Sequence, residues 1–422
     1  MGVFTPSRAG SILGGIAVVG VSAVFLAGCA GDSGGGSGTT DPSESLDLKI
    51  GTALPVTGNL AFLGPPEIAG TEYAASEVNA ANAGVTIEMI QGDSGDTDNK
   101  AYETEIPRLL NEGVSAIIGA ASSGTSLQFI DQVVGAGVIQ FSPANTSAAF
   151  TTYDDNGLYF RTAPSDTLQG EVLGNLIAES GAQTLGMIVL NDSYGTGLAG
   201  FVKDAFEAAG GTVVAEPTYN TGDTNFSAQI SEVVAANPDA IALITFEEVK
   251  TMLPELFAAG VPADKLYFVD GNLANFGSNG IDVGGSLEGA KGTLPGLSID
   301  AITDFTSSLQ TFWTDEGNDE LTEFSYAAES YDAVVLLALA SLAAGSTDGA
   351  AIADKLQEVS GGSGDGTTCT SFAECAEIIN SGGVADYDGI SGKITFDDVG
   401  DPTDASIGIY QYTADNDYVA YQ

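Results

Sequence analysis

The pattern that most constrains the fold of this chain is a repeated alternation of short apolar runs with longer amphipathic stretches, beginning at Leu48. The short runs are nearly continuous in apolar residues, as is typical of parallel strands covered on both faces. The longer stretches have helical periodicity, and several stop at glycine. The predicted strands are 48–54, 85–90, 116–119, 138–142, 184–190, 212–217, 240–245 and 266–269, and the predicted helices between them include 67–81, 101–112, 168–179, 198–209, 226–236 and 249–259.

The alternation forms two successive α/β units, one before and one after Phe160-Arg161-Thr162. Beyond Thr293 longer helices follow, at 301–314 and 324–344, with only scattered strands. Because these helices have no sheet of their own, we expect them to return and cover the first unit. The prediction is an α/β fold of two Rossmann-like lobes with parallel sheets, joined by hinge crossovers, with a ligand cleft between them. The predicted lobes are 46–161 plus about 296–396, and 162–295 plus about 397–422.

The first 28 residues have the features of an export signal. They carry one charge, Arg8, and an apolar stretch over 12–27 that only Gly and Ser interrupt. The next step, Leu26-Ala27-Gly28-Cys29, is similar to the bacterial lipobox, in which the Cys is acylated and becomes the mature N-terminus. An ordinary cleaved signal peptide or an uncleaved anchor is the alternative. We expect residues 1–28 to be removed and Cys29 to be a lipid anchor.

The segment after Cys29 is rich in Gly, Ser, Thr and Asp as far as Ser45. Such a composition cannot bury enough apolar surface to become ordered, and it behaves as a flexible tether. Several acyl chains on one Cys anchor a protein stably to a bilayer. The sequence therefore predicts an exported protein, held by its lipid at the outer face of the cytoplasmic membrane, with 29–45 as lipidated Cys and linker.

The charge balance is strongly acidic, with 11 Lys and Arg against 57 Asp and Glu and a net charge of −46. A surface of this kind repels nucleic acid and anionic lipid headgroups, so neither is an expected partner. Screening by a salty exterior would reduce the self-repulsion. Acidic pairs such as Asp397-Asp398 could suggest calcium, but they lack the EF-hand spacing, and a solvated acidic face is the favoured interpretation.

The chain contains no histidine, and this argues against most enzyme classes. It excludes Ser-His-Asp and Cys-His catalysis and any histidine-ligated metal. Paired-carboxylate or Ser-Lys hydrolases remain chemically possible, but no Ser-x-x-Lys motif is present. Beyond Cys29 only Cys369 and Cys375 remain, which favours a disulfide over a zinc site in an exported protein. We therefore expect a protein that is not an enzyme, with no cofactor and no metal.

Polar residues follow three predicted strands, where parallel sheets present ligand sites. Ser122 and Ser123 come after 116–119 and offer an N-cap with free amides for a carboxylate. The segments 141–147, Phe-Ser-Pro-Ala-Asn-Thr-Ser, and 190–195, Leu-Asn-Asp-Ser-Tyr-Gly, follow two further strands. Each segment alone could be ordinary helix or turn capping. Together, on neighbouring strand ends, they indicate a binding site.

The order of these motifs resembles the leucine/isoleucine/valine-binding protein family of ABC importers. Further similarities are Gly-Thr-Ala-Leu-Pro-Val-Thr-Gly at 51–58, Phe160-Arg161-Thr162 at a lobe crossover, and Tyr331-Asp332-Ala333 on a late helix. The resemblance extends over nearly all of the chain from Leu48 to about Tyr412. It implies the type I periplasmic-binding-protein fold, with two lobes that close around a free amino acid.

The resemblance also implies roles for individual residues. Ser122, with Ser123 beside it, Ala144 and Thr146 match the group that holds the ligand carboxylate. Tyr194 matches the aromatic residue that covers the ligand from the second lobe. Phe246 takes a position that is often Tyr in the family, so packing is implied for it rather than a hydrogen bond. Tyr326 aligns with a pocket aromatic, and Leu63 lies where the family often has an aromatic residue in the side-chain pocket.

The partner of the ligand ammonium group is implied to be an acid just after the predicted strand 266–269. Asp270 is the candidate in the run Val269-Asp270-Gly271-Asn272, although strict register could place Asn272 there, and Glu247 is a second acid near the cleft. A buried ammonium group needs such a partner, because an unpaired buried charge costs several kcal/mol. Asp270 could also be only a turn residue that precedes a glycine.

The leading hypothesis is a lipid-anchored substrate-binding subunit of an ABC importer. It would capture a branched-chain or similar amino acid, close about hinges near Arg161-Thr162 and Thr293-Leu294, and deliver the ligand to permease subunits in the membrane. The same fold could instead bind urea, a short amide or an aromatic acid, or serve as a ligand-sensing receptor. An extracellular hydrolase is disfavoured by the missing histidine.

Overall fold

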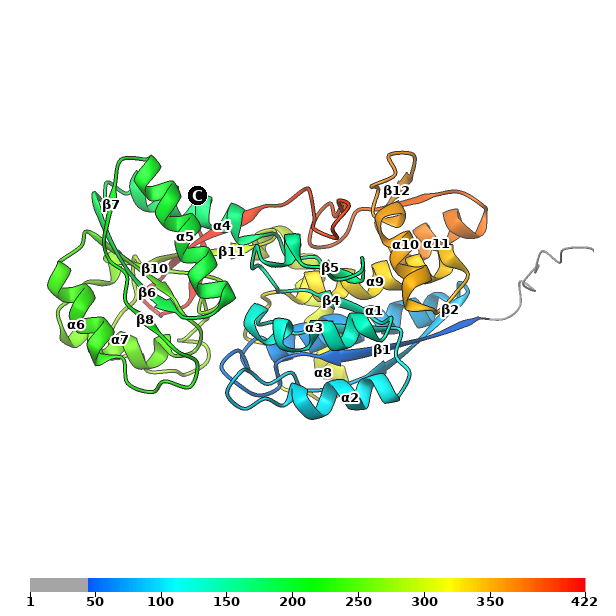
Figure 1. Ribbon diagram of the computed structural model, residues 1–422, viewed down its shortest axis with the longest axis horizontal. Helices are drawn as coiled ribbons and strands as arrows, with labels where there is room; N and C mark the ends of the chain where they lie inside the picture. Colours follow the sequence, from blue (N-terminus) through cyan, green and yellow to red (C-terminus); the bar gives the residue numbers. More distant parts are fainter. Residues whose placement is uncertain (1–44, 422) are drawn as a thin grey trace, which may run out of the picture. The chain divides into compact units, whose positions relative to one another are not determined.

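The protein is represented by a computed structural model, which describes the structure of residues 45–421. The predicted signal peptide, the predicted lipid anchor Cys29 and nearly all of the predicted linker lie outside the described residues. The strands of the described part form two large sheets and one small one (Figure 1). We call the elements around the five-stranded sheet the first lobe and those around the eight-stranded sheet the second lobe.

The sheet of the first lobe has the strand order β2-β1-β3-β4-β5, and all its neighbours are parallel. Its inner strands β3 and β4 are buried along their whole length, which explains their continuous apolar sequence. Its strands are β1 (Leu46–Ala53), β2 (Val85–Ile90), β3 (Ala116–Gly119), β4 (Ile139–Ser142) and β5 (Tyr159–Arg161).

Seven helices of the described residues belong to the first lobe. They are α1 (Gly64–Ala81), α2 (Tyr102–Asn111), α3 (Ser123–Gly135), α8 (Thr303–Asp315), α9 (Ala327–Ala344), α10 (Gly349–Val359) and α11 (Phe372–Asn380). Helix α9 contacts β1 to β4 and packs along α1, so the late helices do return to the first sheet as expected. By length and composition α9 could cross a membrane, but 83% of it is buried, which is typical of a core helix.

The sheet of the second lobe has the order β15-β14-β11-β10-β9-β6-β7, with β8 paired to β6. Strands β6 to β11 are parallel where they pair, whereas β14 is antiparallel to β11 and to β15. The strands are β6 (Thr184–Leu190), β7 (Thr212–Ala215), β8 (Thr218–Tyr219), β9 (Ala240–Ile244), β10 (Leu266–Phe268), β11 (Lys291–Pro295), β14 (Ile407–Tyr412) and β15 (Tyr418–Ala420). The helices are α4 (Asp166–Glu179), α5 (Ser193–Ala208), α6 (Ser227–Ala236) and α7 (Val249–Ala258).

The chain passes between the two sheets at three places. It leaves β5 of the first sheet for α4, leaves β11 of the second sheet for α8, and returns to β14 through residues 397–401. The strands β5, β11, β14 and β15 were not predicted as strands, because they are short or only half-buried and lack a continuous apolar run. The three crossovers bring the ends of several helices close together, and a pocket lies between these helix ends.

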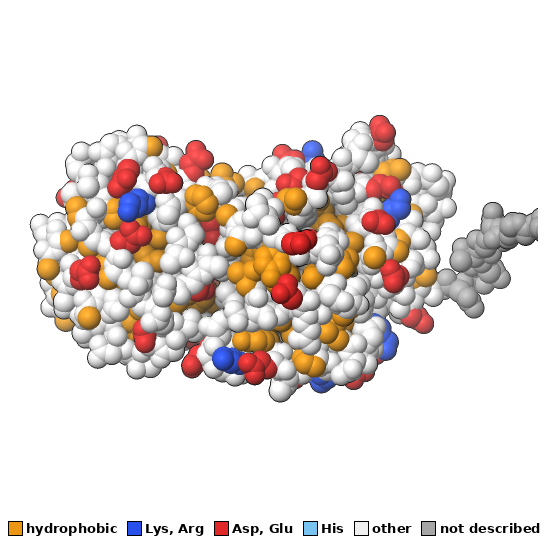
Figure 2. All heavy atoms as spheres, in the orientation of Figure 1, with side chains coloured by type: hydrophobic (Ala, Val, Ile, Leu, Met, Phe, Trp, Pro, Cys, Tyr) orange, Lys and Arg blue, Asp and Glu red, His pale blue; other side chains and the backbone are white. Residues whose placement is uncertain are grey.

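A small third sheet pairs β12 (Thr367–Cys369) with β13 (Ala385–Tyr387), next to α11. Cys369 and Cys375 are joined by a disulfide across this segment. On the face drawn in Figure 2, Asp and Glu side chains are spread over the surface, with few Lys and Arg among them. Within residues 45–421, no group of three or more Cys, Asp or Glu is placed to hold a metal ion.

Candidate functional site

A narrow pocket receives residues from both lobes. The space within it that a water molecule can enter is only about 10 Å³, so the lining side chains lie close together. No Lys or Arg is among its lining residues, so any positive potential comes from backbone N–H groups. The lining residues are Leu60, Leu63, Ala121, Ser122, Ser123, Ala144, Thr146, Tyr194, Phe246, Asp270, Gly271 and Tyr326. All eight residues predicted for the ligand site are therefore together in one pocket.

The first lobe contributes a helix N-terminus to this pocket. Ser122 is the N-cap of α3, and its hydroxyl accepts a hydrogen bond from the Thr125 N–H at 3.2 Å. Within the described part of the chain, the backbone N–H groups of Ser122 and Ser123 have no hydrogen-bond partner. Free amides at the positive end of a helix are a common way to bind a carboxylate.

The loop after β4 lies beside that helix terminus. Ser142 shapes the loop, because its hydroxyl accepts the Ala144 and Asn145 N–H groups at 3.2 and 2.9 Å. The Asn145 side chain ties the loop to the other pocket segment by donating to the carbonyls of Ala120 and Ala121, at 2.9 and 2.8 Å. Thr146 lines the pocket, and among residues 45–421 its backbone N–H has no acceptor.

The second lobe contributes an aromatic wall. Asp192 caps α5 by accepting the Gly195 N–H at 2.7 Å, and this places Tyr194 in the first turn, facing the pocket. The ring of Tyr194 stacks on Phe246, with centroids 5.2 Å apart and an interplanar angle of 16°. Phe246 therefore packs against this tyrosine, and it has no hydroxyl of its own to bond a ligand.

Asp270 is the acid of the pocket. It is 5% exposed and accepts three hydrogen bonds, from the Tyr194 hydroxyl at 2.6 Å, the Tyr326 hydroxyl at 2.8 Å and the Gln169 amide at 3.0 Å. Burial raises the pKa of Asp270, and these donors oppose that rise because they favour the ionised form. All three donors are neutral, so an ionised Asp270 has no positive partner among the described residues it bonds.

A second carboxyl group, Asp166, lies behind the pocket at the start of α4. It is completely buried, and neither of its oxygens has a hydrogen-bond partner in the described part of the chain. Burial, and then the neighbouring Asp270, raise the pKa of Asp166 well above its usual value. Asp270, which accepts three hydrogen bonds, is therefore better placed than Asp166 to carry a negative charge at this site.

The two other residues considered for the ammonium group do not line the pocket. Asn272 is used inside the second lobe, where its amide donates to the Leu243 carbonyl at 2.6 Å and its oxygen accepts the Val269 N–H at 3.0 Å. Glu247 forms an ion pair with Lys250. Of the three alternatives, only Asp270 lies where it can contact a ligand in this pocket.

Contacts between the lobes surround the pocket. The Ser147 hydroxyl of the first lobe donates to the Ser193 carbonyl of the second at 3.0 Å. Tyr326, just before α9, has a left-handed backbone (φ 61°), and its hydroxyl crosses to Asp270. A side chain at Gly124, at the start of α3, would stand only 2.7 Å from a carboxylate oxygen of Asp192. The lobes thus meet closely at the residues that line the site.

Some of the site was missed by sequence reasoning. Gln169 and Asp166 belong to α4, for which the sequence analysis gave only a helix at 168–179 and a hinge near Arg161-Thr162. Their position shortly after β5, a strand that was not predicted, was the available signal. Leu60 and Ala121 are apolar and gave no sequence signal for a binding site. Gly271 was noted only as a glycine in a turn.

Comparison with known proteins agrees with this architecture. The family model described as periplasmic binding protein matches residues 47–376. The leucine-, isoleucine-, valine-, threonine- and alanine-binding protein of Pseudomonas aeruginosa is 32% identical over 45% of this chain and 51% of its own, so the chain spans about half of that relative. The chemotactic signal transduction substrate-binding protein BasB of Halobacterium salinarum is 24% identical over 82% of this chain and 83% of its own.

Solved structures share the fold. The leucine-binding protein LivK of Thermotoga maritima superposes with a TM-score of 0.72 at 23% identity, covering 89% of this chain and 98% of its own. A solute-binding protein of an ABC transporter from R. palustris, in complex with benzoate, has a TM-score of 0.68 at 17% identity, covering 89% of this chain and 95% of its own.

Two lobes with parallel sheets, three crossovers and a pocket between the lobes define the class of type I periplasmic binding proteins. Within that class, the chain belongs to the leucine/isoleucine/valine-binding protein family. The resemblance of its motifs to that family is confirmed, as is the predicted fold class. Members of this family are extracytoplasmic substrate-binding proteins rather than enzymes.

Proposed function

We propose that this chain is the substrate-binding lipoprotein of an ABC importer and captures an amino acid with an apolar side chain, branched-chain amino acids first. The lobes close around the ligand, and the closed form delivers it to permease subunits in the membrane. In this proposal the lobes keep the boundaries expected from the sequence, and the hinges lie near Arg161-Thr162 and Thr293-Leu294.

One observation carries this proposal. The pocket combines free helix and loop N–H groups, which suit a carboxylate, with a single buried acid, Asp270, which suits an ammonium group. Leu60, Leu63 and Phe246 supply apolar surface for a side chain. A zwitterion with an apolar side chain satisfies all three features at once, whereas urea or a short amide leaves the acid without a charged partner.

Two alternatives have specific support from relatives. The benzoate-bound structure suggests an aromatic acid, but a ligand without an amine would bury Asp270 beside it unpaired. The relative named for chemotactic signalling matches most of this chain, so a receptor that reports the same amino acid to a signalling partner is the second candidate function. The two functions share the pocket and differ in the partner that recognises the closed lobes.

Titration calorimetry of the chain with leucine, isoleucine, valine, alanine and benzoate tests the ligand class. We expect binding of at least one branched-chain amino acid and much weaker binding of benzoate, because only the amino acid neutralises Asp270. The amino-acid proposal would be rejected if only benzoate gave a heat of binding, or if no amino acid gave one.

The lipid anchor is proposed for Cys29 on the sequence 26–29 and the Gly-rich tether that follows it. Replacing Cys29→Ser should move the exported protein from the membrane fraction to the medium, because the acyl chains can no longer be attached. Cell fractionation with an antibody against residues 45–421 measures this. Equal membrane retention of both forms would argue for an uncleaved anchor instead.

A further inference from the structure

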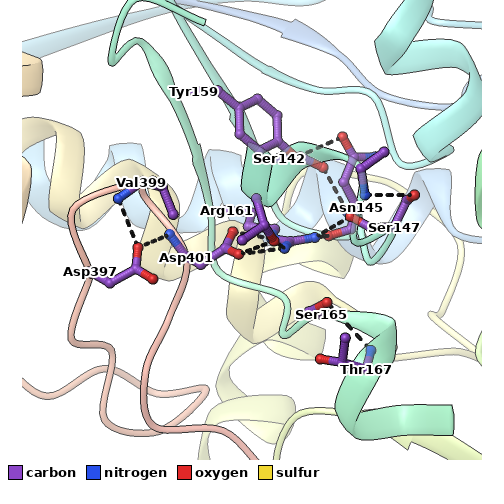
Figure 3. A network of polar contacts seen from close by, with 12 residues as sticks. Ser142, Asn145, Ser147, Tyr159, Arg161, Ser165, Thr167, Asp397, Val399 and Asp401 are labelled. Atoms are coloured by element: carbon purple, nitrogen blue, oxygen red, sulfur yellow. Dashed lines mark hydrogen bonds and ion pairs between the residues drawn. The ribbon is translucent and has the colours of Figure 1, made fainter. Parts of the chain in front are cut away.

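One arginine lies behind the pocket, and every N–H group of its guanidinium donates a hydrogen bond. The side chain of Arg161, at the end of β5, is completely buried. A guanidinium group has five N–H donors, and here all five are bonded. Nε and Nη2 donate hydrogen bonds to the two Asp401 oxygens at 2.6 and 2.7 Å, and Nη2 also donates to the Thr151 hydroxyl at 3.1 Å. Nη1 donates to the carbonyls of Asn145 and Ser147, at 3.3 and 2.9 Å (Figure 3).

These two carbonyls flank Thr146, which lines the pocket and whose N–H has no acceptor among residues 45–421. The carbonyl of Thr146 itself accepts the Asp166 N–H at 2.7 Å. Three successive carbonyl oxygens of this loop are therefore bonded on the side away from the pocket. A carbonyl oxygen turned inward would repel a ligand carboxylate, so this arrangement keeps the donor side of the loop facing the ligand.

The carboxylate that holds Arg161 comes from the third crossover. Residues 397–401 form a tight loop in which Asp397 accepts the Val399 and Asp401 N–H groups at 2.9 and 3.0 Å, as Figure 3 shows. Gly400 has φ 79°, and a Cβ there would collide with the Tyr159 carbonyl. Its own carbonyl accepts the Arg161 N–H at 3.2 Å. The loop thus presents Asp401 in one fixed position.

Neither residue of the pair lines the pocket, and both are on or next to segments that cross between the lobes. We propose that Arg161 and Asp401 are positioning residues for ligand binding: the pair fixes the loop 144–147 in its carboxylate-binding conformation and links that conformation to the crossover 397–401. A bidentate arginine suits this task because its planar fork determines direction as well as distance. The identity of the ligand in this inference rests on the proposed function. The conformation of the loop 144–147 does not depend on that function.

Two substitutions weaken the pair without removing its bulk. Arg161→Lys keeps the charge but cannot bond Asp401 and both carbonyls together, and Asp401→Asn keeps the shape but loses the charge. Thr151→Val is the matched control, because Thr151 contacts the same guanidinium and the same carboxylate but no pocket carbonyl. All three variants should lose stability, so stability alone does not decide the question.

The deciding readout is amide hydrogen exchange of the peptide that contains 144–147, measured without ligand. We expect faster exchange in Arg161→Lys and Asp401→Asn, and wild-type exchange in Thr151→Val. If Arg161→Lys does not fold, Asp401→Asn carries the test. Exchange in 144–147 that is the same in the pair variants as in Thr151→Val would overturn the inference.

Calorimetry with leucine and leucinamide adds a readout specific for the carboxylate. The ratio of the two affinities should fall on the order of tenfold in the pair variants and stay constant in Thr151→Val, since only the acid depends on the donor side of the loop. An unchanged ratio in all variants would also overturn the inference. If the wild type binds neither probe, the proposed function fails, and the exchange experiment still decides the role of Arg161 and Asp401.

Discussion

Replacing Asp270→Asn should weaken leucine binding by roughly 30- to 1000-fold, equivalent to about 2–4 kcal/mol, because a buried ammonium group then loses its only charged partner. The amide keeps the size of the side chain. Its oxygen can accept from one of the two tyrosine hydroxyls, Tyr194 or Tyr326, and its NH2 group can donate to the other. The lobes should therefore close as before, and the loss should appear in the affinity rather than in the fold. Calorimetry at neutral pH measures it.

The matched ligand is 4-methylpentanoate, which is leucine without its amine. Its affinity should stay equal or rise in Asp270→Asn, because the variant no longer buries a negative charge beside it. Glu247→Gln is the matched protein control, since this acid pairs with Lys250 outside the pocket. Equal losses for leucine and 4-methylpentanoate would remove Asp270 from the ammonium role.

The second large effect concerns a buried acid near a hinge. Glu329, in the first turn of α9, is 6% exposed and lies beside the crossover residue Gly296. Its backbone carbonyl accepts the hydroxyl of the hinge residue Thr162 at 3.0 Å. Burial raises the pKa of Glu329 to about 8, from 4.5. Glu67, on α1, is also fully buried, and burial followed by Glu329 raises its pKa well above the usual value.

The direction of the pH dependence follows from this shift. Between about pH 4.5 and pH 8 the folded protein keeps a proton on Glu329 that the unfolded chain has released, so the free energy of unfolding falls as the pH rises. The contribution of Glu329 to the free energy of unfolding is complete below pH 4.5 and is lost as the pH passes 8. In total it amounts to roughly 5 kcal/mol. Glu329→Gln removes this dependence, because the amide cannot ionise.

Urea unfolding of wild type and Glu329→Gln at pH 5, 7 and 9 tests this prediction. The variant should match the wild type at the lowest pH and exceed it by several kcal/mol at the highest. Glu320→Gln, on an exposed part of the preceding loop, is the control and should leave the slope unchanged. Parallel stability curves for Glu329→Gln and wild type would contradict the assignment.

Much of the fold could be read from the sequence because its signals are local. A buried parallel strand is a short apolar run wherever it occurs, and a helix stop is a glycine directly after the last turn, as at Gly210. The strands β14 and β15 and the helices α10 and α11 were not found. The two strands are antiparallel at the edge of the second sheet and half-buried, so their residues give no continuous apolar run.

The candidate site was predictable to the extent that parallel sheets gather their strand ends. Polar residues at the ends of β3 and β4 had to lie near one another because these strands are parallel neighbours, whereas β6 belongs to the other sheet. Ser122, Thr146 and Tyr194 do line one pocket. Their roles in ligand binding remain a prediction, as do the lobe boundaries and the lipid on Cys29.

The sequence by itself determined the two-lobed α/β class and which strand ends carry polar groups, because periodicity and capping depend on residues a few positions apart. Only the tertiary structure shows that Asp270 lines the pocket and Asn272 does not, because Asn272 bonds the Leu243 carbonyl inside the second lobe. It also paired Arg161 with Asp401 across 240 positions. No local pattern predicts such a pair, because its partners meet only after both lobes have folded and the third crossover has returned between them.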